Sequence, residues 1–269
     1  MPPSAFGPAS SALPLELATS ARTKIAHGDR RRSELAKALS NWWGIDEHPV
    51  KVTTRQHGTF VDIVLVSDKK PPVQTWRFKA HEVLHAFRTA LDNFHHEVHQ
   101  HFGGAAESHT YFPIFEDDGK WARWARSHSH LPQAILDRYR TTQPFATKNP
   151  RLLHLRRLDD LEKHPGLVAA AVSFQSMEML FDTTVEGLVK PKKRSERWEQ
   201  EGHLNIDSGE AVVTTIDLHY PVVDTVQVSA ALNFEPELRF ATESIPLMRA
   251  LEAFRADTDE ALATVLGRK

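Results

Sequence analysis

The chain of 269 residues contains no cysteine. This absence excludes disulfide bonds, thiolate zinc sites and cysteine nucleophiles. Long apolar runs are also missing, because no stretch approaches the roughly 18 consecutive apolar residues of a membrane-spanning helix. The N-terminal residues MPPSAFGPASSALPLEL have neither the basic segment nor the continuous apolar core of a secretory signal. We therefore expect a soluble, cytoplasmic protein.

The chain likewise lacks an excess of charge of either sign. Its formal net charge is −2, so any binding to nucleic acid or to an anionic membrane would have to come from a local patch. A content of 41% hydrophobic and 25% charged residues is typical of a globular protein with a full core. The unusual component is histidine: 16 imidazoles would begin to gain charge just below neutral pH.

Hydrophobic periodicity predicts an α+β fold, in which antiparallel β-meanders pack with a helical core and a C-terminal amphipathic helix. We expect a flexible tail over residues 1–14 and a single domain over 15–269. The parts of that domain are N-terminal helices interrupted at Gly28-Asp29 (15–48), a β-meander whose third strand runs from Val73 to Phe78 (49–78), a helical core (79–165), a β-rich part with a basic loop at 190–197 (166–240) and the C-terminal helix (241–269).

One predicted helix, Lys79 to Phe102, has two chemically different faces. At about 100° per residue, one broad side is apolar and must be buried. The adjoining side, which we call the polar strip, is less than a third of the circumference wide. It gathers five imidazoles, a guanidinium and a carboxylate: His81, His85, Arg88, Asp92, His95, His96 and His99. This strip carries the candidate functional residues.

The start of the strip contains the motif HExxH, at His81-Glu82-Val83-Leu84-His85. In zinc hydrolases, two histidines one turn apart bind the metal and the glutamate activates water. Glu107 or Asp92 would then supply the third ligand. Residues 88 and 91, however, are Arg and Leu rather than the Gly and His of the extended motif, and a cationic Arg88 would oppose the metal. A zinc site at His81 and His85 is thus an alternative, and the leading interpretation needs no metal or cofactor.

Arg88, Asp92 and His95 support a second interpretation, because residues four and three apart on a helix can touch. Arginine can hold a phosphate through two hydrogen bonds, histidine can exchange a proton near neutral pH, and a carboxylate can fix the histidine tautomer. These roles suffice for metal-independent RNA cleavage, in which the 2′-hydroxyl attacks its own phosphate. We therefore expect a protein that acts on or binds RNA, as an endoribonuclease if it is an enzyme.

A resemblance extends this interpretation. The run EVLHAFRTALDN (82–93) resembles the helix signature of an uncharacterised bacterial family, E/D-x-x-H-x-x-R-[ST]-A-L-D. Phe112-Pro113-Ile114 resembles the family's Phe-Pro-Ile element, and Glu162-Lys163-His164 stands where the family has Asp-Lys-His. The order of meander, helix, Phe-Pro-Ile, Lys-His helix and C-terminal strands is similar over roughly residues 30–269. The family's histidine five residues after the arginine is replaced by Asn93.

The family helix is in turn similar to the Arg-x4–6-His motif of HEPN domains, many of which are RNases or RNA-binding partners in toxin and antiphage systems. This similarity implies a HEPN-like helical core and a homodimer through the 79–102 helix. It also implies that Arg88 binds the scissile phosphate and that His95 is the acid or base. Asp92, His85 and His164 would then support these two residues.

A third interpretation is that the protein is a non-catalytic ligand-binding or protein-interaction module. Buried polar side chains on a helix can satisfy one another and fix the packing of their neighbours. Glu82, His85, Arg88 and Asp92 could form such a structural network with Glu162 and His164. The RNA interpretation and the structural-network interpretation can be distinguished in a structure. RNA cleavage requires Arg88 and His95 to face a common hollow that solvent can reach, whereas a structural network does not.

Overall fold

The computed structural model describes residues 12–44, 49–105, 111–160, 168–183, 192–198, 202–217, 226–234, 236–240 and 243–268. The chain forms two compact units. A helical unit comprises Met1–Glu34, Phe78–Pro165 and Arg249–Lys269, and a β-rich unit comprises Leu35–Arg77 and Gly166–Met248. Helices and antiparallel sheets together confirm the α+β class. The single domain over 15–269 and the HEPN-like character of the core stay predictions.

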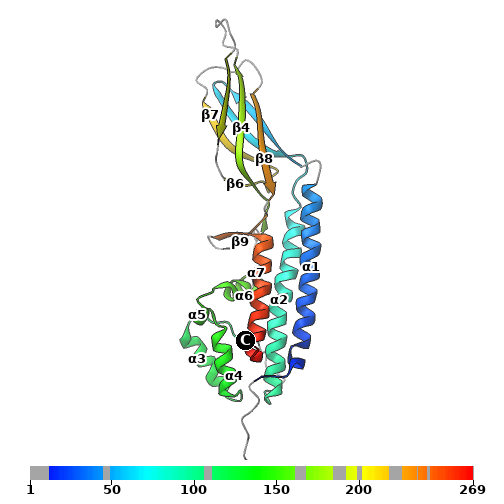
Figure 1. Ribbon diagram of the computed structural model, residues 1–269, viewed down its shortest axis with the longest axis vertical. Coiled ribbons are helices and arrows are strands. Elements are labelled where there is room, and N and C mark those ends of the chain that lie inside the picture. Colours follow the sequence, from blue (N-terminus) through cyan, green and yellow to red (C-terminus); the bar gives the residue numbers. More distant parts are fainter. Residues whose placement is uncertain are drawn as a thin grey trace, which may run out of the picture. The chain divides into compact units, whose positions relative to one another are not determined.

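Three long helices form the frame of the helical unit (Figure 1). They are α1 (Thr19–Trp43), which follows the short 3-10 helix η1 (Leu15–Ala18), α2 (Val73–His101) and α7 (Leu247–Leu266). Four shorter helices complete the unit: α3 (Asp118–Ser127), α4 (Gln133–Thr141), α5 (Pro144–Thr147) and α6 (Arg151–Asp160). The apolar face predicted for the 79–102 helix is confirmed, since Val83, Leu84, Phe87, Leu91 and Phe94 are fully buried on α2.

The β-rich unit contains three antiparallel sheets. The first has the order β1 (Val50–His57), β2 (Phe60–Ser67), β7 (Glu210–Asp217); the second has the order β10 (Glu243–Pro246), β9 (Glu237–Phe240), β3 (Val168–Ala169). In the third sheet, the long strand β4 (Ala171–Thr183) pairs with β8 (Val226–Phe234) along one edge and with β5 (Lys192–Trp198) and β6 (Gly202–Asn205) along the other.

The prediction of a strand from Val73 to Phe78 is wrong, because α2 already begins at Val73. Two prolines precede this start, and the amide of Trp76 donates to the Pro72 carbonyl in the first turn. Proline is favoured at such a position because its fixed φ suits a helix and its missing N–H costs nothing there. Trp76 is fully buried in its own unit. The third strand of the meander is instead β7, from more than a hundred residues later in the chain.

Gly28-Asp29 does not interrupt the first helix as predicted, since α1 runs unbroken from Thr19 to Trp43. Gly28 allows α1 and α2 to pack closely against each other. A Cβ atom at this position would lie 2.6 Å from Cε1 of Phe87 and 3.3 Å from Cβ of Ala86, both on α2. Glycine therefore lets the two backbones approach where any side chain would collide.

Two other boundaries also differ from the prediction. Residues 192–197 of the predicted basic loop belong to strand β5, which pairs with β4. Leu13, which was assigned to the flexible tail, is buried and its amide donates to the Leu266 carbonyl over 3.0 Å. No helix of the described residues has the length and apolarity needed to cross a membrane.

Candidate functional site

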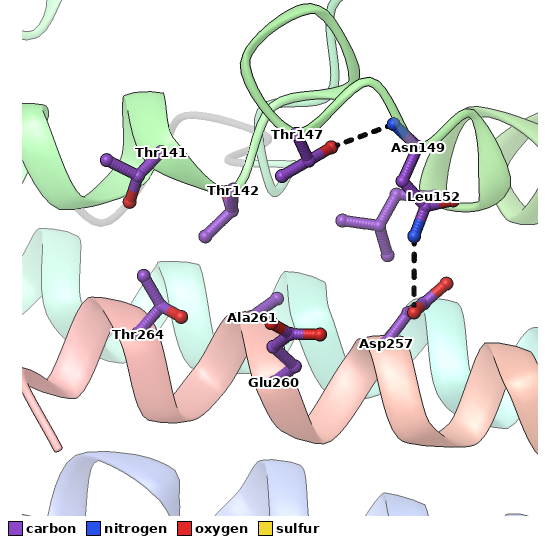
Figure 2. A pocket seen from close by; sticks show the side chains of 9 residues that line it. All are labelled: Thr141, Thr142, Thr147, Asn149, Leu152, Asp257, Glu260, Ala261 and Thr264. Carbon is purple, nitrogen blue, oxygen red and sulfur yellow. Dashed lines mark hydrogen bonds between the residues drawn. The ribbon is translucent and has the colours of Figure 1, made fainter. Parts of the chain in front are cut away.

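A pocket opens in the helical unit where α7 faces α4, α5 and α6 (Figure 2). We call it the α7 pocket, and its volume is ≈ 190 Å³. Most of its lining residues have polar side chains, although much of the surface that they present is aliphatic: Thr141, Thr142, Thr147, Asn149, Leu152, Asp257, Glu260, Ala261 and Thr264. Five of these residues come from the short connected stretch at the end of α4, through α5, to the start of α6, and the others project from α7.

Asp257 is the buried carboxylate of the α7 pocket, with a side chain that is 5% exposed. Arg151 donates two hydrogen bonds to it, from Nε to Oδ2 over 2.7 Å and from Nη2 to Oδ1 over 2.8 Å. Such a two-point contact fixes the carboxylate and neutralises its charge. Glu260, one turn later on α7, places a second carboxylate at the pocket, and none of the described lining residues carries a positive charge.

Three threonines present hydrogen-bond acceptors at the α7 pocket. The hydroxyl protons of Thr141, Thr142 and Thr147 are donated to the backbone carbonyls of Arg138, Tyr139 and Gln143. A hydroxyl has one proton and two lone pairs, so a threonine whose proton is engaged can still accept hydrogen bonds. Thr142 Oγ1 already accepts from Gln143 Nε2 over 3.3 Å, and Thr147 Oγ1 from the Asn149 amide over 3.2 Å, so each of these oxygens keeps one further lone pair. The pocket is therefore rich in acceptors and poor in donors.

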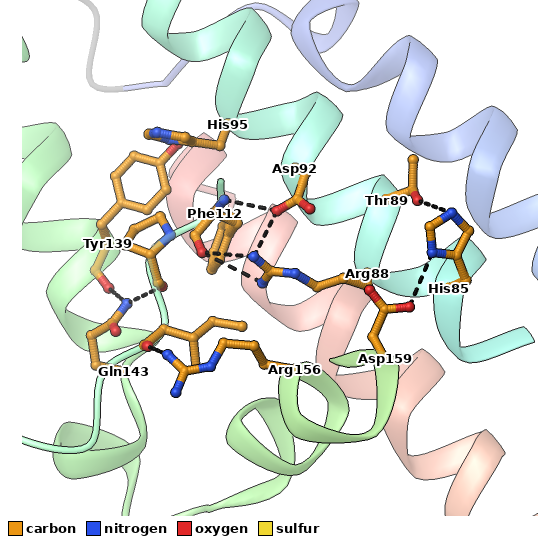
Figure 3. Close-up of polar contacts among 12 residues, drawn as sticks. His85, Arg88, Thr89, Asp92, His95, Phe112, Tyr139, Gln143, Arg156 and Asp159 are labelled. Atoms are coloured by element: carbon orange, nitrogen blue, oxygen red, sulfur yellow. Dashed lines mark hydrogen bonds and ion pairs between the residues drawn. The ribbon is translucent and has the colours of Figure 1, made fainter. Parts of the chain in front are cut away.

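The polar strip lies in the same unit, and three of its residues, Arg88, His95 and His99, are buried. Figure 3 shows the contacts of Arg88, Asp92 and His95. Arg88 is 6% exposed, and its Nη2 lies 2.9 Å from Oδ1 of Asp92, one turn further along α2. Both residues also bind the backbone of Phe112: Arg88 donates to the carbonyl over 3.4 Å, and Asp92 accepts the amide proton over 2.8 Å. Burial raises the pKa of Asp92, although Arg88 and the Phe112 amide act in the opposite direction.

The extended Phe-Pro-Ile segment, Tyr111–Phe115, is held by further side chains rather than by a sheet. Gln143 is fully buried; its amide donates to the Pro113 carbonyl, and its Oε1 accepts from the Phe115 amide, both over 2.9 Å. Arg156 on α6 donates to the Ile114 carbonyl over 2.5 Å. Side chains from α2, from the α4–α5 connection and from α6 thus satisfy the backbone groups that this buried segment would otherwise leave unpaired.

His95 is fully buried, and its Nδ1 lies 3.0 Å from the hydroxyl of Tyr139 on α4. Burial lowers the pKa of His95 to about 3, and the neighbouring histidines His128, His99, His130 and His96 add to this effect. The imidazole is therefore neutral near pH 7. The sequence-based condition for RNA cleavage, an accessible hollow shared by Arg88 and His95, is not met, because neither residue reaches solvent to a useful extent.

The remaining predicted site residues are separate from this buried network or lie outside the described residues. The side chain of His85 is 64% exposed, with its Nδ1 3.0 Å from Oδ1 of Asp159. His164 and Glu162 fall outside the described residues, as does Glu107. Among the described residues, no three His, Asp or Glu side chains are placed to hold a metal ion. The zinc alternative at His81 and His85 thus gains no third ligand from this part of the chain.

Comparison of the chain with protein-family models, with curated proteins and with solved structures finds no match. The resemblance to the bacterial family and to HEPN domains therefore stays a prediction. The function must be argued from the chemistry of the residues themselves.

Sequence reasoning missed Gln143, Tyr139 and the α7 pocket. One signal could have located part of the pocket: Asp257 lies three residues after the buried Phe254 and four before the buried Ala261, on the apolar face of α7. A carboxylate at such a position needs a partner, because a buried unpaired charge is costly. No comparable signal marks Gln143, whose partners are backbone groups distant in the sequence.

Proposed function

We propose that the protein is a non-catalytic ligand-binding module. Its α7 pocket binds a small cationic molecule rich in hydrogen-bond donors, while the polar strip of α2 holds the helical unit together. The observation that carries this proposal is the lining of the pocket, in which Glu260, Asp257 and three threonine hydroxyls all present acceptors.

The ligand class follows from the charge and the hydrogen-bonding state of the lining. The lining contains two carboxylates, Asp257 and Glu260, and none of its described residues is cationic, so the pocket favours a cation over an anion. Because the threonine protons are engaged by backbone carbonyls, the ligand must supply donors. An ammonium group with one or two further amino or hydroxyl groups, as in a diamine or an amino sugar, meets both requirements.

The size of the pocket limits the ligand to a small molecule. Its ≈ 190 Å³ is somewhat larger than a cavity of about 150 Å³ that is known to hold benzene, so it suits a ligand of similar or slightly larger size. The rim is also shaped by a strained residue, Lys148, which has a φ of 55° and joins Thr147 to Asn149. A non-glycine residue in this region costs about 1 kcal/mol, and such strain is typical of binding sites.

Calorimetry with small amines tests the proposal. Putrescine, spermidine and glucosamine would be titrated into the full chain, with glucose and acetate as uncharged and anionic comparisons. Glu260→Gln keeps the shape of the side chain but removes its charge, so we expect at least about tenfold weaker amine binding, or about 1.4 kcal/mol. Glu252→Gln, at an exposed position two turns earlier on α7, is the matched control and should bind as the wild type does.

Two results would contradict the proposal: no saturable binding of any of the amines, or equal loss of binding in the Glu260 and Glu252 variants. Binding of acetate in preference to the amines would reverse the inferred charge of the ligand.

RNA binding or cleavage, with a homodimer through α2, is the competing proposal from the sequence. It would require the Arg88–Asp92–Phe112 contacts to open, because Arg88 and His95 are buried. A labelled RNA incubated with the protein in EDTA tests it, together with Arg88→Lys and His95→Asn variants that are checked for folding. RNA cleavage by the wild type that folded variants lose would favour the nuclease, whereas intact RNA throughout would favour the binding module.

A further inference from the structure

Four histidines from separate parts of the helical unit meet beside the Phe-Pro-Ile segment. We call them the histidine quartet: His95 and His99 on α2, His128 at the end of α3, and His130 in the turn that leads to α4. The ring centroids of His99 and His130 are 4.4 Å apart. Those of His95, His99 and His128 form a triangle with sides of 6.1, 5.9 and 6.0 Å.

The contacts of the quartet depend on neutral rings. His130 Nε2 and His99 Nδ1 are 2.8 Å apart, so one nitrogen must carry a proton and the other must offer a lone pair. If both rings were protonated, both nitrogens would carry hydrogen, the bond would be lost and two positive charges would face each other. Nε2 of His95 and Nε2 of His99 are both buried and have no hydrogen-bond partner.

The groups that face the quartet give it no compensating negative charge. Trp124 of α3 stacks on His128 with ring centroids 4.1 Å apart, and its carbonyl accepts a hydrogen bond from His128 Nδ1. Tyr139 of α4 binds His95 through its hydroxyl. His96 adds a further imidazole from α2. Within the described chain, no ion pair joins any of the four rings to a carboxylate. Burial lowers the pKa values of His128 and His130 as well as that of His95.

We propose that the histidine quartet is a proton-sensitive clasp, which holds α3 and its turn against α2 while its rings are neutral and releases them when the rings take up protons. The His99–His130 bond tolerates one proton, because a single imidazolium can still donate to the neutral ring, but it is lost when both rings are protonated. Like charges in a poorly solvated cluster then favour a conformation in which the imidazoles reach water. Acidification below the reference histidine pKa of about 6.5 should therefore loosen this part of the unit selectively.

Hydrogen exchange of the full chain from about pH 7.5 to about pH 5.5, corrected for intrinsic rates, measures this release. We expect protection in residues 118–141 to fall by about tenfold or more, since each extra proton bound by the open form shifts the equilibrium up to tenfold per pH unit. Protection in α7 should fall by less, because protonation of His95 lowers the stability of the whole fold without releasing α7 selectively. Hydrogen exchange is measured here without any ligand, so a negative result would refute the clasp but would not bear on the proposed amine site.

A double variant, His128→Asn with His130→Gln, separates the clasp from general acid effects. Asparagine places an amide near Nδ1 of His128, and glutamine places one near Nε2 of His130, so both observed bonds can persist without titration. We expect the variant to keep its protection in 118–141 at low pH. His101→Gln, at an exposed position on α2, is the matched control and should behave as the wild type does.

Three results would overturn the proposal: loss of protection with acid in the double variant as in the wild type, equal loss in α7, or no loss in the wild type. Imidazole resonances of the wild type give a measurement that does not depend on the variant folding. His128 and His130 must take up protons within the pH range over which protection is lost, and proton uptake with unchanged protection would also refute the clasp.

Discussion

Arg88 and Asp92 form an ion pair of 2.9 Å within one turn of α2, and the two side chains bind the backbone carbonyl and the backbone amide of the same residue, Phe112. Arg88 binds the carbonyl and Asp92 binds the amide, so the ion pair and the Phe-Pro-Ile segment stabilise each other. These contacts explain why a guanidinium and a carboxylate lie at this place on α2 without requiring that either of them bind a substrate.

Removing Asp92 should be strongly destabilising. Asp92→Ala would leave the buried Arg88 without its carboxylate and the Phe112 amide without its acceptor, at a cost of about 3 kcal/mol in the free energy of unfolding. The comparison is Glu34→Gln, which breaks the more exposed pair with Arg31 and should have a much smaller effect, because solvent screens an exposed pair. Urea denaturation measures both, and equal costs would show that the buried pair is not a structural element.

Gln143 should be nearly as important, although it carries no charge. Gln143→Leu keeps the bulk of the side chain but leaves the Pro113 carbonyl and the Phe115 amide unpaired, which should lower the free energy of unfolding by about 3 kcal/mol. Gln133→Leu, at an exposed position on α4, should change it by less than about 0.5 kcal/mol. Faster hydrogen exchange at residues 111–115 in the Gln143 variant alone would localise the effect.

Gly28 tests the close approach of α1 and α2. Alanine has a higher helix propensity than glycine by about 1 kcal/mol, so an isolated helix would gain stability. In this chain the added Cβ would meet the buried Phe87 ring at 2.6 Å, and overpacking should make Gly28→Ala a net loss of about 1–2 kcal/mol. Ser33→Ala, on the exposed side of the same helix, should be neutral or slightly stabilising. A stabilised Gly28 variant in thermal denaturation would contradict the close approach.

His95 should make the stability of the fold depend on pH. Its pKa is about 3 in the folded state and about 6.5 in the unfolded state, so between these values the unfolded chain binds a proton that the folded chain does not. The stabilisation is complete above about pH 6.5 and decreases as the pH falls toward 3, by about 3 kcal/mol at pH 4.5. His95→Asn, which can still bind Tyr139, should have a flatter profile in urea denaturation, and parallel profiles for the two proteins would refute this assignment.

Much of the secondary structure could be predicted because its signals are local. The apolar face of α2, the β1–β2 hairpin and the amphipathic α7 all follow from periodicities within a few turns or residues. The same rules failed at Val73–Phe78 and at Gly28. At Val73 a β-like composition follows two prolines that favour a helix start, and at Gly28 a residue that often ends helices is required by the neighbouring Phe87.

The candidate site was only partly predictable for a related reason. The periodicity of α2 placed Arg88, Asp92 and His95 on one strip, but the same pattern is compatible with an exposed strip or a buried one. Phe112 and Tyr139 decide between them by covering it from later segments. The α7 pocket likewise depends on threonines and a carboxylate that are far apart in the chain.

The amino-acid sequence by itself determined the apolar faces of the long helices and the proximity of Arg88 and Asp92, because each depends on spacing along a single element. Only the tertiary structure decided that His95 is neutral and buried, that Arg88 binds a backbone carbonyl, and that Asp257 and Glu260 border an accessible pocket. Burial and pairing depend on which distant segments cover a side chain, and water is removed from a charged group only when those segments have packed.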